Sequence, residues 1–103
     1  MRMAAPVFRA LGDPTRRALF EKLMLGEKTV ADLTATLHVS QPAVSQHLAV
    51  LRASKLARMR KEGRQNFYRA DPAGLAPLLD WLEHYKKFWP THLDKLKNVL
   101  EKM

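Results

Sequence analysis

Two short predicted helices that follow each other almost without a linker constrain this fold more than any other feature. Apolar residues recur at spacings of three and four from Val30 to Leu37 and again from Val44 to Leu51. This spacing is typical of helices with one buried face. Only His38 and Val39 separate the first predicted helix from the Ser40 cap of the second. We therefore predict a helix-turn-helix over residues 29–54.

The second of these helices carries amide, hydroxyl and imidazole groups on the side that its apolar stripe leaves exposed. Groups of this kind read base edges in the major groove of DNA, and amides at a helix N-terminus bind phosphate. We predict that Gln41 and Gln46 contact bases and that Ser45 contacts a base edge or a phosphate. Ser40 is predicted to cap the helix beside a phosphate, and His47 is a further candidate for base contact. The alternative for the whole set is an ordinary cap with solvent-exposed neighbours.

The residues before this pair predict two more helices. A short apolar helix from Ala5 to Leu11 is followed by Asp13, which can cap a second helix that has Pro14 in its first turn. Arg16 and Arg17, which come next, fit either a structural role at the start of this helix or a contact with phosphate. The first half of the chain is thus predicted to be entirely helical.

Positive charge is concentrated in the second predicted helix of the helix-turn-helix and in the segment that follows it. The 103 residues include 18 Lys and Arg against 10 Asp and Glu, which gives a net charge of +8. Between Ser40 and Arg69 there are seven Lys and Arg residues and one acid, Glu62, so six of the eight net charges lie in this segment. Such clustering fits a polyanionic partner such as nucleic acid.

The same segment changes its side-chain period to two after Leu56 and turns at Glu62-Gly63-Arg64. This pattern predicts a β-hairpin over residues 56–70 with a basic tip. We predict that Arg60, Lys61 and Arg64 reach an adjacent minor groove or its phosphates.

The C-terminal third repeats mostly apolar residues, with His92 at one position, at alternating intervals of four and three from Leu78 to Met103, in a phase that is kept across Pro90. We predict a long helix from about Pro77. This helix is expected to be bent or interrupted near Trp89, because proline removes one hydrogen bond and clashes with the preceding turn.

The predicted elements follow the order of a winged helix-turn-helix domain, which is mostly α with a small β-hairpin wing: two helices, a helix-turn-helix, a basic hairpin and a long helix. The segments LGDPTRRALFEKL, TVADLTATLHVSQPAVSQHLAVLRASKL and EGRQNFYRAD resemble the ArsR family of bacterial transcriptional regulators. The segment KKFWPTHLDKLK is similar to a branch of that family that does not sense metals. We therefore expect residues 1–103 to form one domain, with the helix-turn-helix at 29–54, the wing at 56–70 and a C-terminal dimerisation region at 72–102.

The resemblance implies a repressor that binds double-stranded promoter DNA. Because the chain has no cysteine and no apolar run long enough to span a membrane, we expect it to be cytoplasmic. We expect a homodimer that pairs through its first and last helices and faces an inverted repeat. The predicted dimer interface consists of Val7, Phe8, Leu11, Leu78, Leu82, Tyr85, Trp89 and Leu96. The sequence does not indicate a small-molecule effector.

Metal sensing is the best-known activity of this family, and the residues here do not favour it. The family's thiolate site lies on the first helix of the helix-turn-helix, where Thr29–Leu33 offers no soft ligand, and the chain has no cysteine. The family's second set of metal ligands, on the last helices, is also incomplete in this sequence. Asp80 and His84 nevertheless share a helix face and fit half of a zinc site between subunits. We predict no metal ligands and no cofactor. A metal- or small-molecule-responsive repressor of the same fold remains the alternative.

Other classes of protein fit less well. The four glycines form no phosphate-cradling loop, and no Ser, His and acid are placed as a nucleophilic triad, so we predict that the chain is not an enzyme. No segment approaches the roughly 20 apolar residues of a membrane span, so we predict no membrane partner. A protein-interaction module without DNA binding is a further alternative, which the basic hairpin argues against.

Overall fold

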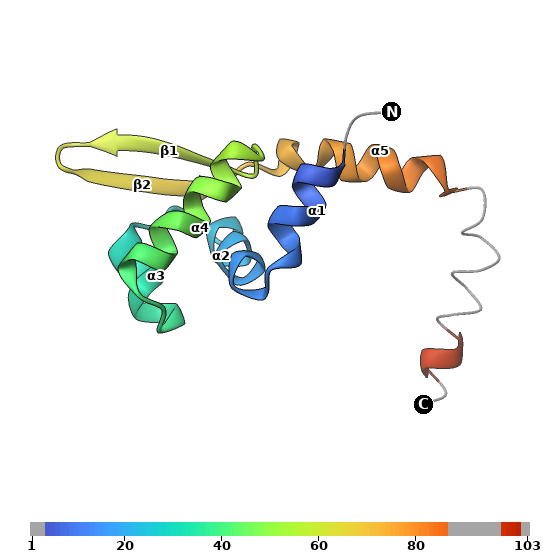
Figure 1. Cartoon of the computed structure of the whole chain (residues 1–103), viewed down its shortest axis with the longest axis horizontal. Coiled ribbons are helices and arrows are strands. Elements are labelled where there is room, and N and C mark those ends of the chain that lie inside the picture. The colour runs from blue at the N-terminus through green and yellow to red at the C-terminus, as the bar shows by residue number, and fades with distance from the viewer. Residues whose placement is uncertain (1–3, 87–97, 102–103) are drawn as a thin grey trace.

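A computed structural model of the chain describes residues 4–86 and 98–101. Helices and a two-stranded hairpin follow each other in the predicted order, and the hairpin extends away from the helices (Figure 1). The elements are α1 (Ala5–Gly12), α2 (Pro14–Met24), α3 (Val30–Leu37), α4 (Gln41–Ala53), β1 (Ala57–Glu62), β2 (Gln65–Ala70), the 3-10 helix η1 (Pro72–Leu75) and α5 (Ala76–His84). The predicted winged helix-turn-helix fold is confirmed.

Side-chain caps start both helices of the helix-turn-helix. Thr29 Oγ1 accepts a hydrogen bond from the Asp32 amide at 3.1 Å, and the Asp32 carboxylate accepts one from the Thr29 amide at 3.0 Å. This reciprocal capping box satisfies two amides that have no partner within α3. Ser40 Oγ accepts from the Ala43 amide at 3.3 Å and starts α4. Both helices lie inside the predicted range of 29–54.

Arg16 and Arg17 join α1 to α2. Arg16 Nε donates to the carbonyl oxygen of Ala10 at 2.8 Å, and Arg17 Nη1 donates to that of Leu11 at 2.8 Å. These carbonyls belong to the last turn of α1, where the helix itself provides no donor. Of the two roles considered for these arginines, the structure shows the structural one.

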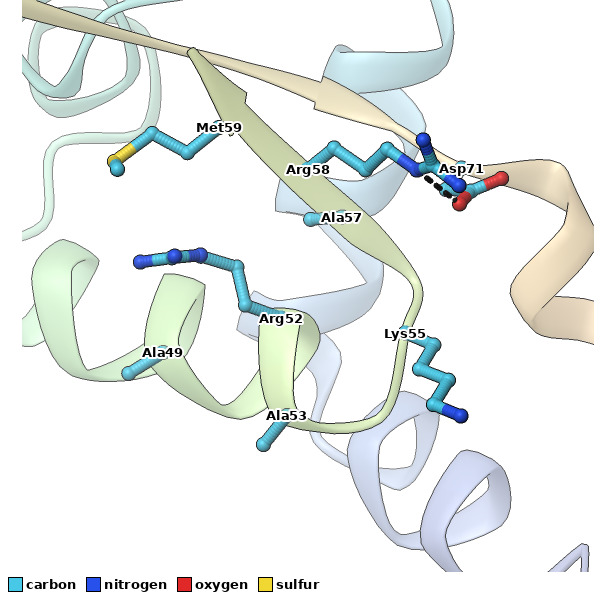
Figure 2. A pocket seen from close by; sticks show the side chains of 8 residues that line it. All are labelled: Ala49, Arg52, Ala53, Lys55, Ala57, Arg58, Met59 and Asp71. Atoms are coloured by element: carbon cyan, nitrogen blue, oxygen red, sulfur yellow. Dashed lines mark hydrogen bonds and ion pairs between the residues drawn. The ribbon is translucent and has the colours of Figure 1, made fainter. Parts of the chain in front are cut away.

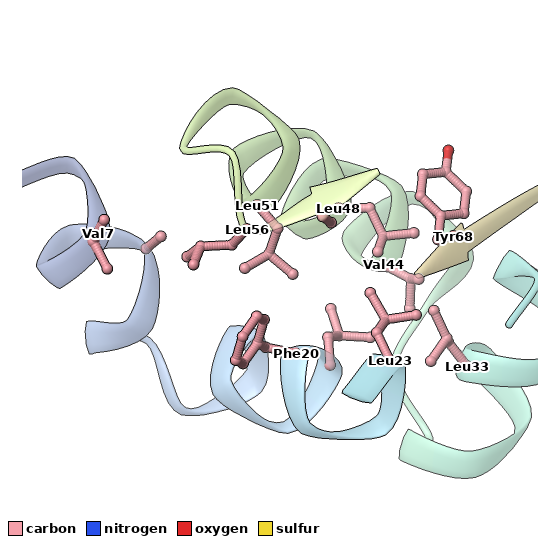
Figure 3. Packing of buried hydrophobic residues seen from close by; sticks show 12 residues of the cluster. Val7, Phe20, Leu23, Leu33, Val44, Leu48, Leu51, Leu56 and Tyr68 are labelled. Atoms are coloured by element: carbon pink, nitrogen blue, oxygen red, sulfur yellow. The ribbon is translucent and has the colours of Figure 1, made fainter. Parts of the chain in front are cut away.

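The hydrophobic core lies where α2, α3 and α4 meet the base of the hairpin (Figure 3). Tyr68 of β2 is 9% exposed and joins this core, so the wing is anchored by a side chain as well as by the chain connection. The largest fully buried side chains are Leu19, Leu33, Val44, Leu48, Leu51 and Leu56.

The hairpin has a tighter turn than predicted. Glu62 pairs with Gln65 as the last pair of the ladder, so only Gly63 and Arg64 form the turn. Gly63 has a φ of 61°, which suits the first central position of a two-residue type II′ turn.

Lys28 also pairs with Tyr68 through two backbone hydrogen bonds of 2.9 and 2.8 Å. This bridge, which was not predicted, ties β2 to the segment before α3.

The last helix differs from its prediction. It starts at Ala76, close to the predicted Pro77, but it ends at His84 rather than near Trp89. The bend or interruption predicted near Trp89 falls within residues 87–97, which the structure does not describe. Trp89 and Leu96 lie outside the described residues.

No helix among the described residues is long and apolar enough to cross a membrane.

Candidate nucleic-acid interface

The first two turns of α4 present the polar face that the sequence predicts. Gln41, Ser45 and Gln46 are exposed, and their side chains form no hydrogen bond with another described residue. Ser40 is also exposed, but its hydroxyl is used as the helix cap. The packing of Val44 and the other buried α4 residues into the core fixes this orientation, so amides and a hydroxyl remain available to an external ligand.

His47 lies on a different side of α4. Its ring is half-buried, and its Nδ1 lies 3.4 Å from Arg16 Nη1, which is placed to donate to it. The imidazole therefore contacts α2, and base contact by His47 stays a prediction that this geometry does not favour.

One face of the wing carries arginines that are already paired. Arg58 Nε lies 2.6 Å from an Asp71 carboxylate oxygen, while Arg60 contacts Glu27 at 2.7 Å and Glu62 at 2.6 Å. The hydrogen bond from Arg60 is the main reason that the pKa of Glu27 lies below its ordinary value, and the two acids in turn raise the pKa of Arg60. With Arg69 opposite Arg58, three arginines on this face meet three acids, so the face is close to neutral.

The tip of the wing carries positive charge that is not compensated. Lys61 and Arg64 are exposed, and neither forms an ion pair with another described residue. Arg64 is the second residue of the turn, beside Gly63, so it projects from the most distant part of the hairpin. Two of the three predicted wing contacts, Lys61 and Arg64, are thus free for an anion, whereas Arg60 is not.

An open groove of about 630 Å³ runs between α4 and β1, and Arg52 lies at its edge with its side chain toward Met59 (Figure 2). Arg52 is exposed and forms no ion pair within the described part of the chain. Arg52 is not among the predicted contacts, although its spacing of seven from Ser45 places both residues on one side of the helix.

The residues predicted for dimerisation separate into two groups. Val7 is 2% exposed and Leu11 and Leu78 pack against the core, so these three mainly stabilise the fold of the chain itself. Phe8 and Tyr85 are 43% and 40% exposed.

The exposed group forms part of a row of aromatic rings. Trp81 lies between Phe8 and Tyr85, with ring centroids 5.3 and 5.1 Å apart. Leu79, which was not predicted, is 60% exposed, and Leu82 is half-buried. Helices α1 and α5 thus present an apolar surface outside the core.

His84, which was considered as a zinc ligand, contacts one end of this aromatic row. Its ring packs edge-on against Tyr85 at 4.9 Å. Within residues 4–86 and 98–101, no three His, Cys, Asp or Glu side chains lie together as a metal site would require.

A helix-turn-helix with a free polar face, flanked by a hairpin with a basic tip, defines a winged helix-turn-helix DNA-binding protein. The model of the family described as "Bacterial regulatory protein, arsR family" matches residues 13–59. The chain is 45% identical over 94 residues to the HTH-type transcriptional regulator Rv2034 of Mycobacterium tuberculosis, which covers 91% of this chain and 85% of the relative. It is 35% identical over 101 residues to the arsenical resistance operon repressor of Escherichia coli, covering 94% of this chain and 81% of the relative.

A solved structure, the ArsR-like transcriptional regulator from Rhodococcus sp. RHA1, superimposes with a TM-score of 0.77 at 34% identity, over 97% of this chain and 92% of that chain. The protein therefore belongs to the ArsR family of DNA-binding transcriptional regulators, as its sequence predicted.

Proposed function

We propose that this regulator is a repressor that binds an inverted-repeat operator as a homodimer. The observation that carries the proposal is the free polar face of α4 beside the uncompensated cations of the wing tip. Base edges are read by hydrogen-bonding side chains, whereas phosphates are held by cations and contribute affinity without sequence choice. The chain has both kinds of group on neighbouring elements.

The contacts divide between the two elements. On α4, Gln41 and Gln46 read bases and Ser45 contacts a base edge or phosphate. On the wing, Lys61 and Arg64 hold phosphates or the adjacent minor groove. Ser40 contributes through the helix N-terminus that it caps.

Arg52 joins the phosphate contacts from the far end of α4. Seven residues of helix rise by about 10 Å, so Arg52 lies roughly that far from Ser45 along the helix axis. A side chain at this position reaches the sugar-phosphate strand that borders the groove read by Gln46. His47 and Arg60 are placed outside the direct contacts, because His47 Nδ1 lies against Arg16 and Arg60 Nε and Nη1 donate to Glu27 and Glu62.

The dimer forms through the exposed apolar residues of α1 and α5, including Phe8, Leu79 and Tyr85. A two-fold axis at this surface would present two copies of α4 to DNA about one helical turn apart. Repression by occupation of a promoter fits the naming of the E. coli relative as an operon repressor. The protein would act in the bacterial cytoplasm, where its operator lies.

The test is DNase I footprinting on the region upstream of the chain's own gene. We expect protection of two half-sites related by inverted symmetry, with centres about one helical turn apart. Binding to this region that is no tighter than binding to a random duplex of equal length would reject an autoregulated operator. No binding to either duplex would reject the DNA-binding role of α4 and the wing.

A further inference from the structure

We propose that Arg60 is a positioning residue that clamps the wing to the helix-turn-helix, and that it does not contact DNA. This inference rests on the proposed function, because the clamp matters for holding the free cations of the wing at a set distance from α4. It also assigns a role to Glu27, which no sequence pattern indicates.

Three segments of the chain meet at the Arg60 guanidinium. Arg60 Nε donates to Glu27 Oε2 at 2.7 Å, and Nη1 donates to Glu62 Oε2 at 2.6 Å. The guanidinium carbon also lies 4.6 Å from the ring centroid of Phe67, the residue paired with Arg60 across the hairpin. Glu27 precedes α3, Glu62 ends β1, and Phe67 belongs to β2, so one side chain connects the wing to the start of the helix-turn-helix.

The clamp lies beside a backbone bridge between the same parts of the chain. Lys28, next to Glu27, exchanges two backbone hydrogen bonds with Tyr68, next to Phe67. The side-chain clamp and the backbone bridge therefore fasten the same two segments. Because Thr29 follows immediately as the cap of α3, the segment that holds the wing also starts the helix-turn-helix.

Charge argues against a phosphate contact by Arg60. A phosphate that approached this guanidinium would meet two carboxylates already bound to it, and like charges repel. The Arg60 and Glu27 side chains are 51% and 35% exposed, and exposed ion pairs add little to overall stability. The pair therefore contributes to geometry. It limits the angle between the hairpin and the helix-turn-helix, while Lys61 and Arg64 remain free for DNA.

The experiment compares Arg60→Gln, Glu27→Gln and the double variant by fluorescence anisotropy across a salt series. The probes are a labelled fragment of the upstream region and a labelled random-sequence duplex. Arg64→Gln is the control for a phosphate contact, and Glu21→Gln, on exposed α2 surface, is the control for the loss of an acid.

If Arg60 is a clamp, Glu27→Gln weakens binding about two- to fivefold although it makes the protein more positive. Arg60→Gln should weaken binding to the same extent with an unchanged slope of log K against log salt. The double variant should bind no more weakly than either single variant, because both remove the same contact. Arg64→Gln should lower the slope by about one, and Glu21→Gln should not weaken binding.

The clamp is overturned if Arg60→Gln lowers the salt slope as Arg64→Gln does, or if Glu27→Gln tightens binding. A loss in Arg60→Gln that Glu27→Gln does not reproduce also overturns it. If the wild type binds neither duplex, the proposed function fails, and hydrogen exchange of the Lys28 and Tyr68 amides in the free protein decides the clamp. Faster exchange in both variants supports it, and unchanged exchange rejects it.

Discussion

At the scale of single residues, Gly74 shows how close packing of backbones demands a particular amino acid. η1 passes so near the turn after α4 that a Cβ on Gly74 would overlap the carbonyl group of Lys55 and press on the Leu56 amide. These neighbours are backbone atoms, which cannot move aside as a flexible side chain can. Gly74→Ala should therefore lower the free energy of unfolding by about 1–3 kcal/mol, measured by urea denaturation.

Gly12→Ala is the matched control for this substitution. Gly12 ends α1, and a Cβ there would meet nothing within 4 Å. Alanine favours the helix more than glycine does, so this variant should keep the wild-type stability or gain up to about 1 kcal/mol. Equal losses in the two variants would show that the contact with Lys55 is not what requires glycine.

Residue positions on a helix were predictable, whereas partners distant in sequence were not. The exposure of Gln41, Ser45 and Gln46 follows from helical spacing within a few residues. Arg16, which contacts His47, and Glu27, one of the two acids that bind Arg60, lie 31 and 33 residues away in the sequence, and no local pattern contains that information. The predicted roles of these two residues were consequently the ones that the structure does not favour.

At the scale of elements, helix starts were easier to predict than helix ends. Thr29 and Ser40 carry cap hydroxyls that are visible in the sequence, and both helices start where these residues predict. The end of α5 has no such marker, since the apolar stripe continues past His84. The single-residue bridge at Lys28 was also missed, because one residue has no period.

The carboxylate caps predict how stability depends on pH. Hydrogen bonds from the Arg16 and Thr29 amides are the largest causes of the lowered pKa values of Asp13 and Asp32, whose ordinary value is 3.8. A depressed pKa in the folded state means that the carboxylate stabilises the fold above pH 3.8 and that this is lost as pH falls through the folded-state pKa. The melting temperature of the wild type should therefore decrease on acidification through and below this value.

The variant Asp13→Asn/Asp32→Asn removes both titrating groups and keeps side chains that can accept a hydrogen bond at the caps. Its melting temperature, followed by circular dichroism, should depend less on pH in this acid range than that of the wild type. Parallel curves for the two proteins would show that the caps do not contribute to acid sensitivity.

At the scale of the whole molecule, the order of elements was sufficient to predict the winged helix-turn-helix fold, and the resemblance of three sequence segments indicated the ArsR family. The residues of the proposed dimer surface were harder to predict, because periodicity identifies an apolar stripe without telling core residues from exposed ones. Val7 and Leu78 contribute to the core of the chain itself, whereas Leu79 is exposed on α5.

Leu79→Glu tests the dimer directly. A charge placed at a buried interface is costly to desolvate, so we expect this variant to sediment as a folded monomer and to lose affinity for the upstream fragment. Met24→Glu is the control, because Met24 is also exposed, at 49%, but lies on α2. The proposed interface is wrong if the wild type is monomeric or if both variants sediment as the wild type does.

The most direct test of the whole account is one set of DNA affinities, measured for the wild type, Gln46→Ala and Arg64→Ala across a salt series. Each protein is titrated with the footprinted operator and with a random duplex. Gln46→Ala should lose about 1–3 kcal/mol on the operator and nothing on random DNA. Arg64→Ala should weaken both and lower the salt slope by about one. Equal losses on both duplexes for Gln46→Ala, or an unchanged affinity and slope for Arg64→Ala, would contradict the division between a base-reading helix and a phosphate-binding wing.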